Sequence, residues 1–225
     1  RWVAYLVAPP EREARGGAEG SQAPGGGQRP GGGGGSRELV LRDLVSGDSV
    51  TFADVNSHSF PENTGVLLIR KPGPGRDAGY SGSDLVLYFL ATGTSLNLGN
   101  VSGFEVNEPG THLAYTVDAK DDAGNGLYLL DLGSNAIIPL DTDPATYADL
   151  TWDDVGQALA VFRGSVPEGK VERENALLVL RRVTSPYSVQ VLDPTAAAGF
   201  PGGFVLSERG GIRWADDAAR IFVGI

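Results

Sequence analysis

Residues 111–117 read THLAYTV, and this short apolar strand recurs along the chain. Five copies align: residues 1–7 (RWVAYLV), 65–71 (GVLLIRK), 111–117 (THLAYTV), 157–163 (QALAVFR) and 219–225 (ARIFVGI). Their third residues lie 64, 46, 46 and 62 positions apart, so the basic period is 46 residues and two intervals carry an insertion. A period of about 40–50 residues is typical of one blade of a β-propeller.

Up to three further strand-like segments lie around each copy, and all three are present around the second, third and fourth copies. A second apolar strand follows the copy, and a turn of Gly, Asn, Ser or Pro then leads to a short third strand, which is a hairpin signature. Another strand precedes the copy, and its marker residue lies seven positions before the aligned apolar residue. The marker residues are Phe60, Val106, Trp152 and Trp214. The second and third strands are expected at residues 39–41 and 49–52, 85–87 and 95–98, 127–129 and 136–140, and 177–179 and 188–192.

Four antiparallel strands repeated at this period predict an all-β fold, a β-propeller of about four four-stranded blades. We expect residues 1–225 to form one propeller segment, a partial ring or a fragment of a seven- or eight-bladed propeller. Each blade should bury both faces of its sheet against its neighbours, because an isolated repeat cannot cover its own apolar surface. This explains why the strands read as continuous apolar runs.

Two segments interrupt the repeat. Residues 15–36 are almost entirely Gly, Pro and small polar residues, a composition that predicts a disordered loop. Residues 184–211 lengthen the last interval and should run as a long loop over one face of the propeller. Loops of this kind often carry function, although this one contains no recognisable catalytic motif.

Composition excludes several classes of partner. The net charge of −10 and the pI near 4.6 argue against nucleic acid and anionic membranes, because phosphate would be repelled. The chain contains no Cys, so disulfides and thiolate metal sites are excluded. No apolar run reaches the 18 residues that suggest a membrane span. Both ends lie inside strand-like patterns, which suggests a piece of a longer protein.

Ser81 is the best candidate for a nucleophile, because residues 79–83 read GYSGS. A nucleophile elbow requires G-x-S-x-G on a turn from a strand to a helix. Here the final Gly is replaced by Ser83, and a strand rather than a helix is predicted to follow. A flexible approach to a hairpin is therefore the favoured interpretation of Ser81.

The two histidines, His58 and His112, are candidate bases or ligands. His112 occupies the position that Trp2 holds in the first copy, which predicts a strand residue. His58 lies at the start of a predicted innermost strand, where it could face a central channel. Two separated His without Cys do not favour a transition-metal site, so structural or solvated roles are preferred.

Acidic segments offer a second kind of candidate. Residues 118–126 (DAKDDAGNG) could suggest Ca²⁺, but they lack the Gly and Glu spacing of an EF-hand loop, and a turn explains them equally well. Asp153-Asp154 and Asp216-Asp217 recur at equivalent turns of two repeats, which favours a structural role over paired catalytic carboxylates. Overall, the sequence predicts no catalytic, cofactor-binding or metal-binding residue, and no cofactor.

The Gly-rich runs do not match phosphate-binding loops. Residues 31–35 lead into Ser36-Arg37 instead of Gly-Lys-Ser/Thr, and no helix is predicted after them. Residues 73–75 (GPG) fail the dinucleotide fingerprint for the same reason. Trp152 and Trp214 share one repeat position, which favours core residues over a ligand platform.

Three segments together resemble the N-terminal β-propeller of bacterial prolyl oligopeptidase-type (dipeptidyl peptidase IV-like) serine peptidases: residues 101–117 (VSGFEVNEPGTHLAYTV), 125–132 (NGLYLLDL) and 150–162 (LTWDDVGQALAVF). Similar blades occur in TolB-like proteins. In the peptidase family the catalytic Ser, Asp and His belong to a C-terminal α/β-hydrolase domain, and no position here matches them.

The resemblance implies a non-catalytic propeller that caps a hydrolase domain and gates the access of peptides. The implied partners are the protein's own C-terminal α/β-hydrolase domain and a peptide substrate, without nucleic acid or membrane insertion. It also favours an extracytoplasmic location, periplasmic or secreted. Two alternatives are a TolB or WD-repeat-like scaffold that binds proteins, and a propeller enzyme with a glycosidase- or lactonase-like site in its channel. The propeller enzyme would require inward-facing carboxylates or metal ligands from several blades.

Overall fold

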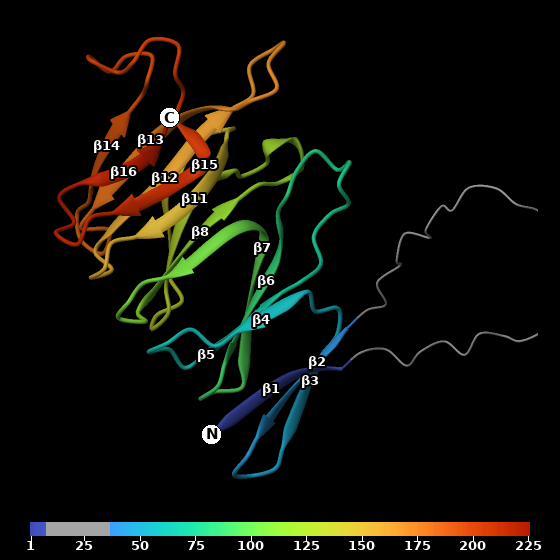
Figure 1. Cartoon of the computed structure of the whole chain (residues 1–225). Helices are drawn as coiled ribbons and strands as arrows, with labels where there is room; N and C mark the ends of the chain where they lie inside the picture. Colours follow the sequence, from blue (N-terminus) through green and yellow to red (C-terminus); the bar gives the residue numbers. More distant parts are fainter. Residues whose placement is uncertain (8–36) are drawn as a thin grey trace, which may run out of the picture. The chain divides into compact units, whose positions relative to one another are not determined.

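The computed structural model describes residues 1–7 and 37–225, and these residues divide into two compact units (Figure 1). Unit 1 covers Arg1–Ser57 and unit 2 covers His58–Ile225. The Gly-rich segment predicted at residues 15–36 lies outside the described residues. Almost all regular structure in the described residues is β-strand, with one short 3-10 turn at Lys120–Asp122.

Unit 1 contains a three-stranded antiparallel sheet in the order β1-β2-β3. The strands are β1 (Trp2–Val7), β2 (Glu38–Asp43) and β3 (Ser49–Phe52). Asp43 ends β2 and accepts hydrogen bonds at Oδ2 from Arg1 Nε (3.0 Å) and at Oδ1 from the Val45 amide (2.9 Å). The Arg1 guanidinium and the Val45 amide hold the pKa of this carboxyl down at about 2. We refer to this sheet as the first blade.

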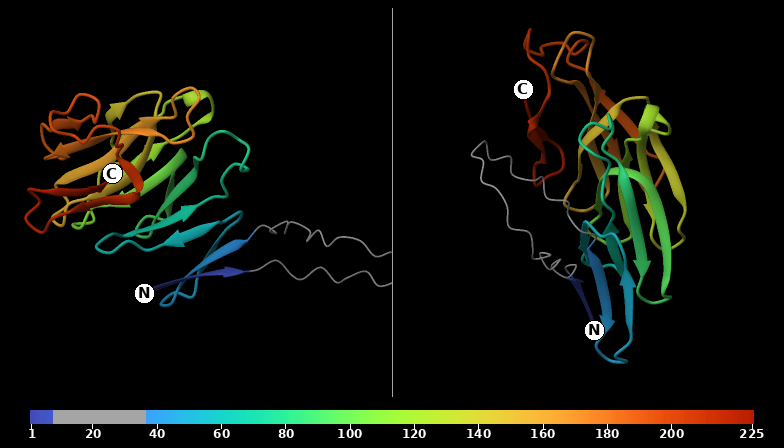
Figure 2. Two further views of the ribbon diagram at one scale, coloured as in Figure 1. Left: turned by 45° about the horizontal axis from the view of Figure 1, so that its top comes forward. Right: turned by 90° about the vertical axis from the view of Figure 1, so that its right-hand side faces the viewer.

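Unit 2 contains three further sheets, with the orders β10-β9-β8-β7-β6-β5-β4, β11-β12-β13-β14 and β15-β16. Figures 1 and 2 show these sheets following one another in chain order, from cyan β4 to red β16. Their strands are β4 (Ser57–Ser59), β5 (Val66–Arg70), β6 (Ser83–Phe89), β7 (Thr94–Val106), β8 (His112–Val117), β9 (Gly126–Asp131), β10 (Ile137–Thr142), β11 (Thr146–Trp152), β12 (Ala158–Ser165), β13 (Glu174–Arg181), β14 (Ser188–Leu192), β15 (Ser207–Trp214) and β16 (Ile221–Gly224).

The strands reproduce the repeat predicted from the sequence. The second blade contains β4, β5, β6 and the first half of β7, and the third contains the second half of β7 with β8, β9 and β10. The fourth blade is β11–β14, and β15 and β16 begin the fifth. The first strand of the fourth blade, β11, lies against β7 on one side and β15 on the other. The described chain is therefore all-β, and within unit 2 the successive blades of a partial propeller are neighbours.

β7 differs from the expected pattern because it serves two blades. Its first half pairs with β6 from Phe89↔Thr94 onward, and its second half pairs with β8 as far as Val106↔Leu113. The sequence predicted separate strands at these places. Register shifts around Gly99–Gly103 let one continuous strand pass from the outer edge of one sheet to the inner edge of the next.

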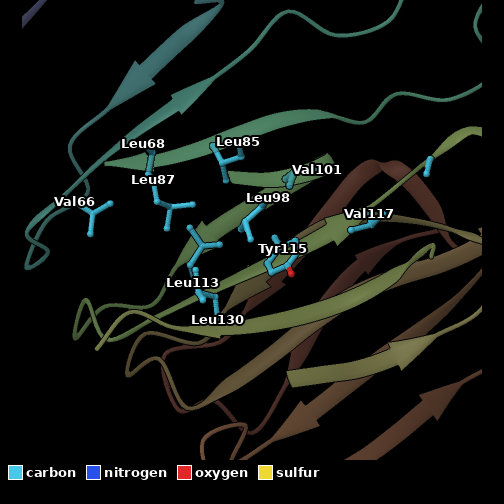
Figure 3. Close-up of a cluster of buried hydrophobic side chains, with 11 residues drawn as sticks. Val66, Leu68, Leu85, Leu87, Leu98, Val101, Leu113, Tyr115, Val117 and Leu130 are labelled. Carbon is cyan, nitrogen blue, oxygen red and sulfur yellow. The ribbon is translucent and has the colours of Figure 1, made fainter. Parts of the chain in front are cut away.

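Three apolar clusters fill the spaces between blades. In the fourth blade, Leu159 and Val161 of β12 pack with residues of the third blade, whereas Phe162 and its alternate neighbours pack toward the fifth. Successive strand residues point to opposite faces of a sheet, so both faces of this blade are buried, as predicted. The cluster between the second and third blades is drawn in Figure 3: Val66, Leu68, Leu85, Leu87, Leu98, Val101, Leu113, Tyr115, Val117, Ala119 and Leu130.

Trp152 and Trp214 link each blade to the one before it in the same way. The Trp152 indole donates from Nε1 to the backbone oxygen of Glu105 (3.1 Å), and the Trp214 indole donates to the backbone oxygen of Thr151 (3.4 Å). In both cases the acceptor immediately precedes the residue that matches the tryptophan in the previous repeat. Both tryptophans are buried, which agrees with the prediction that they are core residues.

The segment at residues 184–211 is partly ordered into strands. It includes β14, which was predicted at residues 188–192, and the first half of β15. The connection between them, residues 193–206, runs beside the loop that joins β12 to β13. Within residues 1–7 and 37–225, no helix has the length and apolar character needed to cross a membrane.

Replacement of Trp152 by Phe should destabilise unit 2, because the Glu105 carbonyl loses its indole donor. The expected loss is about 1–2 kcal/mol, the usual cost of leaving a buried acceptor unpaired. Urea unfolding followed by fluorescence or circular dichroism measures it. Trp214→Phe removes a longer hydrogen bond and should cost less, and equal or larger losses for Trp214→Phe would contradict this ranking.

Candidate functional site

The end of the fourth blade at which β11 begins carries polar side chains around several hollows. Three hollows of about 660, 500 and 300 Å³ open there. Arg173 lines the two smaller hollows, and Asn175 lines the two larger ones. We call this region the rim, defined as residues 146–149, 164–175 and 193–209. It is built from strand ends and loops, which the inter-blade packing leaves free to vary.

An ion pair fastens the β12–β13 loop of the fourth blade to the first strand of the fifth. The Arg173 guanidinium bonds Glu208 of β15. Asn175 donates from Nδ2 to the backbone oxygen of Leu206 (3.1 Å) and to Glu208 Oε1 (3.2 Å). Glu208 lies in β15 where the register against β16 shifts, between Ser207 and Ile212. At this irregular place its side chain faces the β12–β13 loop. The two blades are therefore joined at the rim by charge as well as by their apolar cores.

Two buried polar atoms at this junction have no hydrogen-bond partner among the described residues, Arg173 Nε and Asn175 Oδ1. Such groups are rare in native proteins. A Cβ built at Gly164 would lie 2.3 Å from Asn175 Oδ1 and 2.3 Å from the backbone oxygen of Glu174. The Asn175 amide group therefore packs directly on the Gly164 backbone. This packing is possible only because Gly164 has no side chain.

Asp149 occupies a strained position in the rim. It lies in a bulge of β11, where the register against β12 shifts between Ala148 and Thr151, and its φ is +53°. Bulges of this kind re-aim side chains and are frequent near functional sites. The surrounding chain displaces water from its carboxyl and Glu208 adds negative charge, so the pKa of Asp149 is raised.

The 300 Å³ hollow beside Asp149 is lined by hydroxyl groups and one guanidinium. The hydroxyl-bearing residues are Ser81, Ser102, Thr116, Thr146 and Tyr147, and the guanidinium belongs to Arg173. The Ser102 and Thr116 hydroxyls lie 2.8 Å apart and hydrogen-bond each other. The hollow thus offers donors and acceptors side by side, which suits recognition of polar groups such as peptide amides.

A second charged group borders the 660 Å³ hollow. Arg163 Nη1 lies 3.1 Å from Asp141 Oδ2 and 3.8 Å from Asp143 Oδ2. Tyr147 donates its hydroxyl to Asp141 Oδ2 (2.6 Å), and burial together with this carboxylate raises the pKa of Tyr147. Asp143 and Arg163 line this hollow, together with Phe200 and Phe204.

The structure gives Ser81 a structural contact. Its hydroxyl and its amide both donate to Asp118 Oδ2, at 2.6 and 2.8 Å, and β6 rather than a helix follows it. Next to it, Gly82 donates to the Asp118 backbone oxygen (3.0 Å). The loop before β6 is therefore held at the end of β8 by hydrogen bonds, an attachment that the sequence did not predict.

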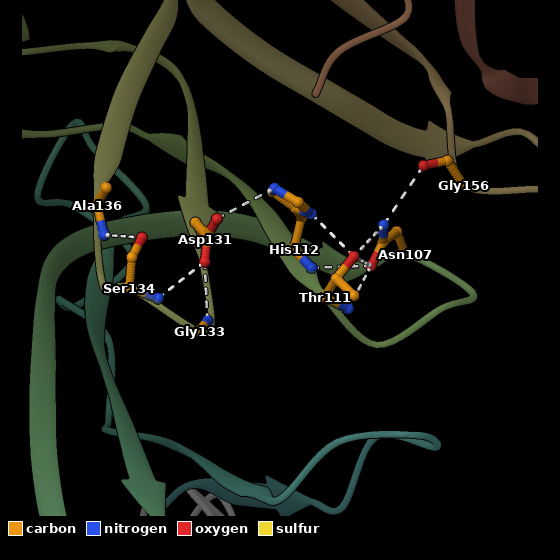
Figure 4. Close-up of polar contacts among 8 residues, drawn as sticks. All are labelled: Asn107, Thr111, His112, Asp131, Gly133, Ser134, Ala136 and Gly156. Carbon is orange, nitrogen blue, oxygen red and sulfur yellow. Dashed lines mark hydrogen bonds and ion pairs between the residues drawn. The ribbon is translucent and has the colours of Figure 1, made fainter. Parts of the chain in front are cut away.

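His112 begins β8, as predicted, at the end of the blade opposite the rim (Figure 4). Its Nδ1 lies 2.9 Å from the Thr111 hydroxyl, and its Nε2 lies 3.7 Å from Asp131 Oδ2. Asp131 Oδ1 accepts the Gly133 and Ser134 amides, which lower its pKa. This cluster borders a hollow of about 670 Å³ between the second and third blades.

The repeat explains most of the His112 cluster. Asn107 Oδ1 accepts the amides of the residues four and five positions later, at 2.9 Å each. Asp153 Oδ1 does the same in the next blade, with Gln157 (2.7 Å) and Ala158 (2.9 Å). The structure therefore gives Asp153 the turn role that was predicted for it. His58 lies in β4, apart from His112 in the chain and in the sheet order.

The acidic loop after β8 is held by its own side chains. Asn125 Oδ1 accepts the Ala119 amide (2.8 Å), and its Nδ2 donates to Asp122 Oδ1 (3.2 Å) and to the backbone oxygen of Ala145 (3.2 Å). Asp217 Oδ1 accepts the Ala219 amide (3.0 Å) in a turn. No group of three or more metal-ligating side chains occurs in the described part of the chain.

Sequence reasoning missed the rim residues Asp149, Arg173 and Glu208. Arg173 lies in the β12–β13 loop and Glu208, 35 positions later, lies in β15, and no motif connects them. The only sequence signal was the length of residues 184–211, which pointed to this face without naming a residue. Within the rim, Arg173 is paired with Glu208 and Arg209 with Glu172, and the Thr195 hydroxyl donates to Asp193 Oδ1 (2.8 Å).

No protein-family model matches the chain, and no curated protein matches it by sequence. Among solved structures, the dipeptidyl peptidase 4 of Porphyromonas gingivalis is similar with a TM-score of 0.56 and 12% identity, over 82% of this chain and 33% of that one. The β-propeller domain of the trilobed protease from Pyrococcus furiosus has a TM-score of 0.45 and 11% identity, over 69% and 48%. TolB from Acinetobacter baumannii has 0.39 and 17%, over 68% and 37%.

The chain thus spans half or less of the length of these proteins. At 12% identity the likeness to the P. gingivalis enzyme shows a shared fold. The described chain is a β-propeller segment, as the sequence predicted, and its fold is similar to that of part of the P. gingivalis enzyme.

Replacement of Gly164 by Ala should loosen the rim, because the new methyl group would overlap the Glu174 carbonyl and the Asn175 amide. Overpacking of this kind costs about 1–3 kcal/mol. Thermal unfolding measures the loss, and Ser165→Ala, an exposed neighbour, serves as the control. Equal stabilities for the two variants would contradict the close packing at Gly164.

Asp149→Asn should stabilise the chain at pH 7 and leave its stability unchanged at pH 3.5. The raised pKa means that the folded state disfavours the ionised carboxyl, so the penalty is present above the folded pKa and disappears below the unfolded value near ~3.9. Asn also tolerates positive φ. The midpoint of thermal unfolding at the two pH values measures the effect, and a gain that persists at pH 3.5 would contradict this origin.

Proposed function

We propose that this chain is the non-catalytic propeller of a prolyl oligopeptidase-type serine peptidase. In this role it caps a C-terminal α/β-hydrolase domain and gates the access of peptides to it. The observation that carries the proposal is the propeller fold shared with the P. gingivalis dipeptidyl peptidase 4 across 82% of the chain. The rim supports it, because it offers polar groups that could bind a peptide around three hollows.

The rim is suited to contact an extended peptide. Backbone amides and carbonyls of a peptide need alternating donors and acceptors, and the rim supplies hydroxyls, carboxylates and guanidinium groups around three adjoining hollows. Phe200 and the half-exposed Phe204 add apolar surface for side chains. Since the Arg173–Glu208 pair bridges two blades, it also holds the rim in one shape.

The experiment compares the full-length protein with residues 1–225 after treatment with a serine-directed fluorophosphonate probe. We expect labelling of the full-length protein and none of residues 1–225. Labelling of residues 1–225 would place the chemistry in the propeller and contradict the proposal. No labelling of an intact full-length protein, together with recovery of a stable protein partner, would favour the TolB-like scaffold instead.

Gating by the rim is tested with Arg173→Gln in the full-length protein. Loss of the Glu208 contact should let the β12–β13 loop move, so kcat/KM should change several-fold for peptides of about ten residues. A dipeptide-length chromogenic substrate, too short to reach the rim, should be cleaved at the wild-type rate. Equal effects on both substrates would contradict a gating role for this pair.

A further inference from the structure

The outer strand of each blade presents a free edge, and β14 is the least protected of these edges. Natural proteins protect exposed strand edges with charges, prolines, bulges or short length. β10 contains Pro139 and a register shift before Asp141, β7 contains a register shift, and β3 has four residues. β14 reads SVQVL, with no charge, no proline and no shift of register against β13.

β14 is also half-exposed on its apolar face. Within the described residues it ends the sheet β11-β12-β13-β14, so one side of its backbone lies unpaired at an edge. The side chains of Val189 and Val191 are 43% and 53% exposed. They are two positions apart and therefore lie on the same face of the strand. An uncharged edge with exposed β-branched residues favours pairing with another strand.

The sequence around β14 is partly symmetric about Gln190, since two of the four flanking pairs of residues are identical. Pro186 and Pro194 lie four positions on either side of it, and Val189 and Val191 flank it directly. If two copies pair antiparallel about a two-fold axis at Gln190, Val189 of each copy lies opposite Val191 of the other. An interface of this kind uses the same surface on both subunits. The prolines, which lack an N–H group, end the ladder at both sides.

Charge also fits a second copy. The chain carries a net charge of −10, which opposes self-association over long range, but the segment that would pair contains no ionisable group other than Tyr187 before Asp193. No like charges would lie opposite each other in the ladder. At physiological salt the remaining charges are screened beyond ~8 Å. Since pairing uses the one free edge of each fourth blade, the assembly stops at two copies.

From these observations we propose that β14 is a self-association surface, at which two copies of this chain pair antiparallel about Gln190. The fourth blades of the two copies then form one continuous sheet. This interface lies on the outer edge of the fourth blade, and the proposal does not rest on the proposed peptidase role.

The chain contains no Cys, so a single introduced Cys can form a disulfide only with the same Cys of a second copy. In a two-fold pair, residue 190 faces itself at a Cα distance of ~4.5–5.5 Å, within the range that a disulfide can bridge. Residue 188 would be ~13 Å from its equivalent, at ~3.3 Å per residue. Gln190→Cys should therefore form a disulfide-linked dimer under mild oxidation, and Ser188→Cys, on the same face, should not.

Equal crosslinking of the two Cys variants, or none in either, would overturn the proposal. Light scattering after size-exclusion chromatography provides a second readout. The unmodified protein should elute as a species with twice the mass of a single chain. Val191→Lys should give single copies, with an unchanged circular dichroism spectrum. Ile138→Lys, which replaces a similarly exposed residue of the outer strand β10, should leave the pair intact. A Val191→Lys variant that remains paired would also overturn the proposal.

Discussion

The packing of one four-stranded sheet against the next is the constraint on which this structure depends. Every apolar cluster of unit 2 lies between two blades and none lies within one. β12 shows why, because alternate residues serve the third and the fifth blade. A fully buried Leu contributes about 1.5–3 kcal/mol relative to exposure, so a blade without neighbours would lose most of its apolar stabilisation. The indole hydrogen bonds of Trp152 and Trp214 then fix how far each blade is offset from the previous one.

This arrangement leaves the strand ends free to carry function. The two ends of a blade differ: the end with His112 and Asp153 is built from turns that repeat from blade to blade, whereas the rim is irregular. At the rim the chain has a strained Asp149, a glycine without space for a side chain, and an ion pair between blades. Such features carry a local free-energy cost, and strained conformations of this kind cluster where a binding surface requires a fixed shape. The inter-blade packing therefore positions the rim as well as stabilising the fold.

Much of the fold was predictable from the 46-residue period, because burial on both faces forces the same apolar strands to recur. β3 and β14 begin and end where the sequence placed them, and Trp152 and Trp214 end their strands as expected. The continuity of β7 was not predictable, since it depends on hydrogen-bond partners in two different sheets. The residues of the candidate site were even harder to predict from the sequence. Asp149 belongs to a bulge that no periodicity marks, and the Arg173–Glu208 pair depends on where the β12–β13 loop meets β15 in space.

The most direct test of the inter-blade account is native-state hydrogen exchange of a Leu159→Ala variant. Leu159 is fully buried in the cluster shared by the third and fourth blades, and its truncation should cost ~2–5 kcal/mol. If blades are stable only through their neighbours, amide protection should fall in β8 and β9 of the third blade as well as in β11–β14. Loss of protection confined to the fourth blade would show that each sheet is stable on its own and would contradict the account.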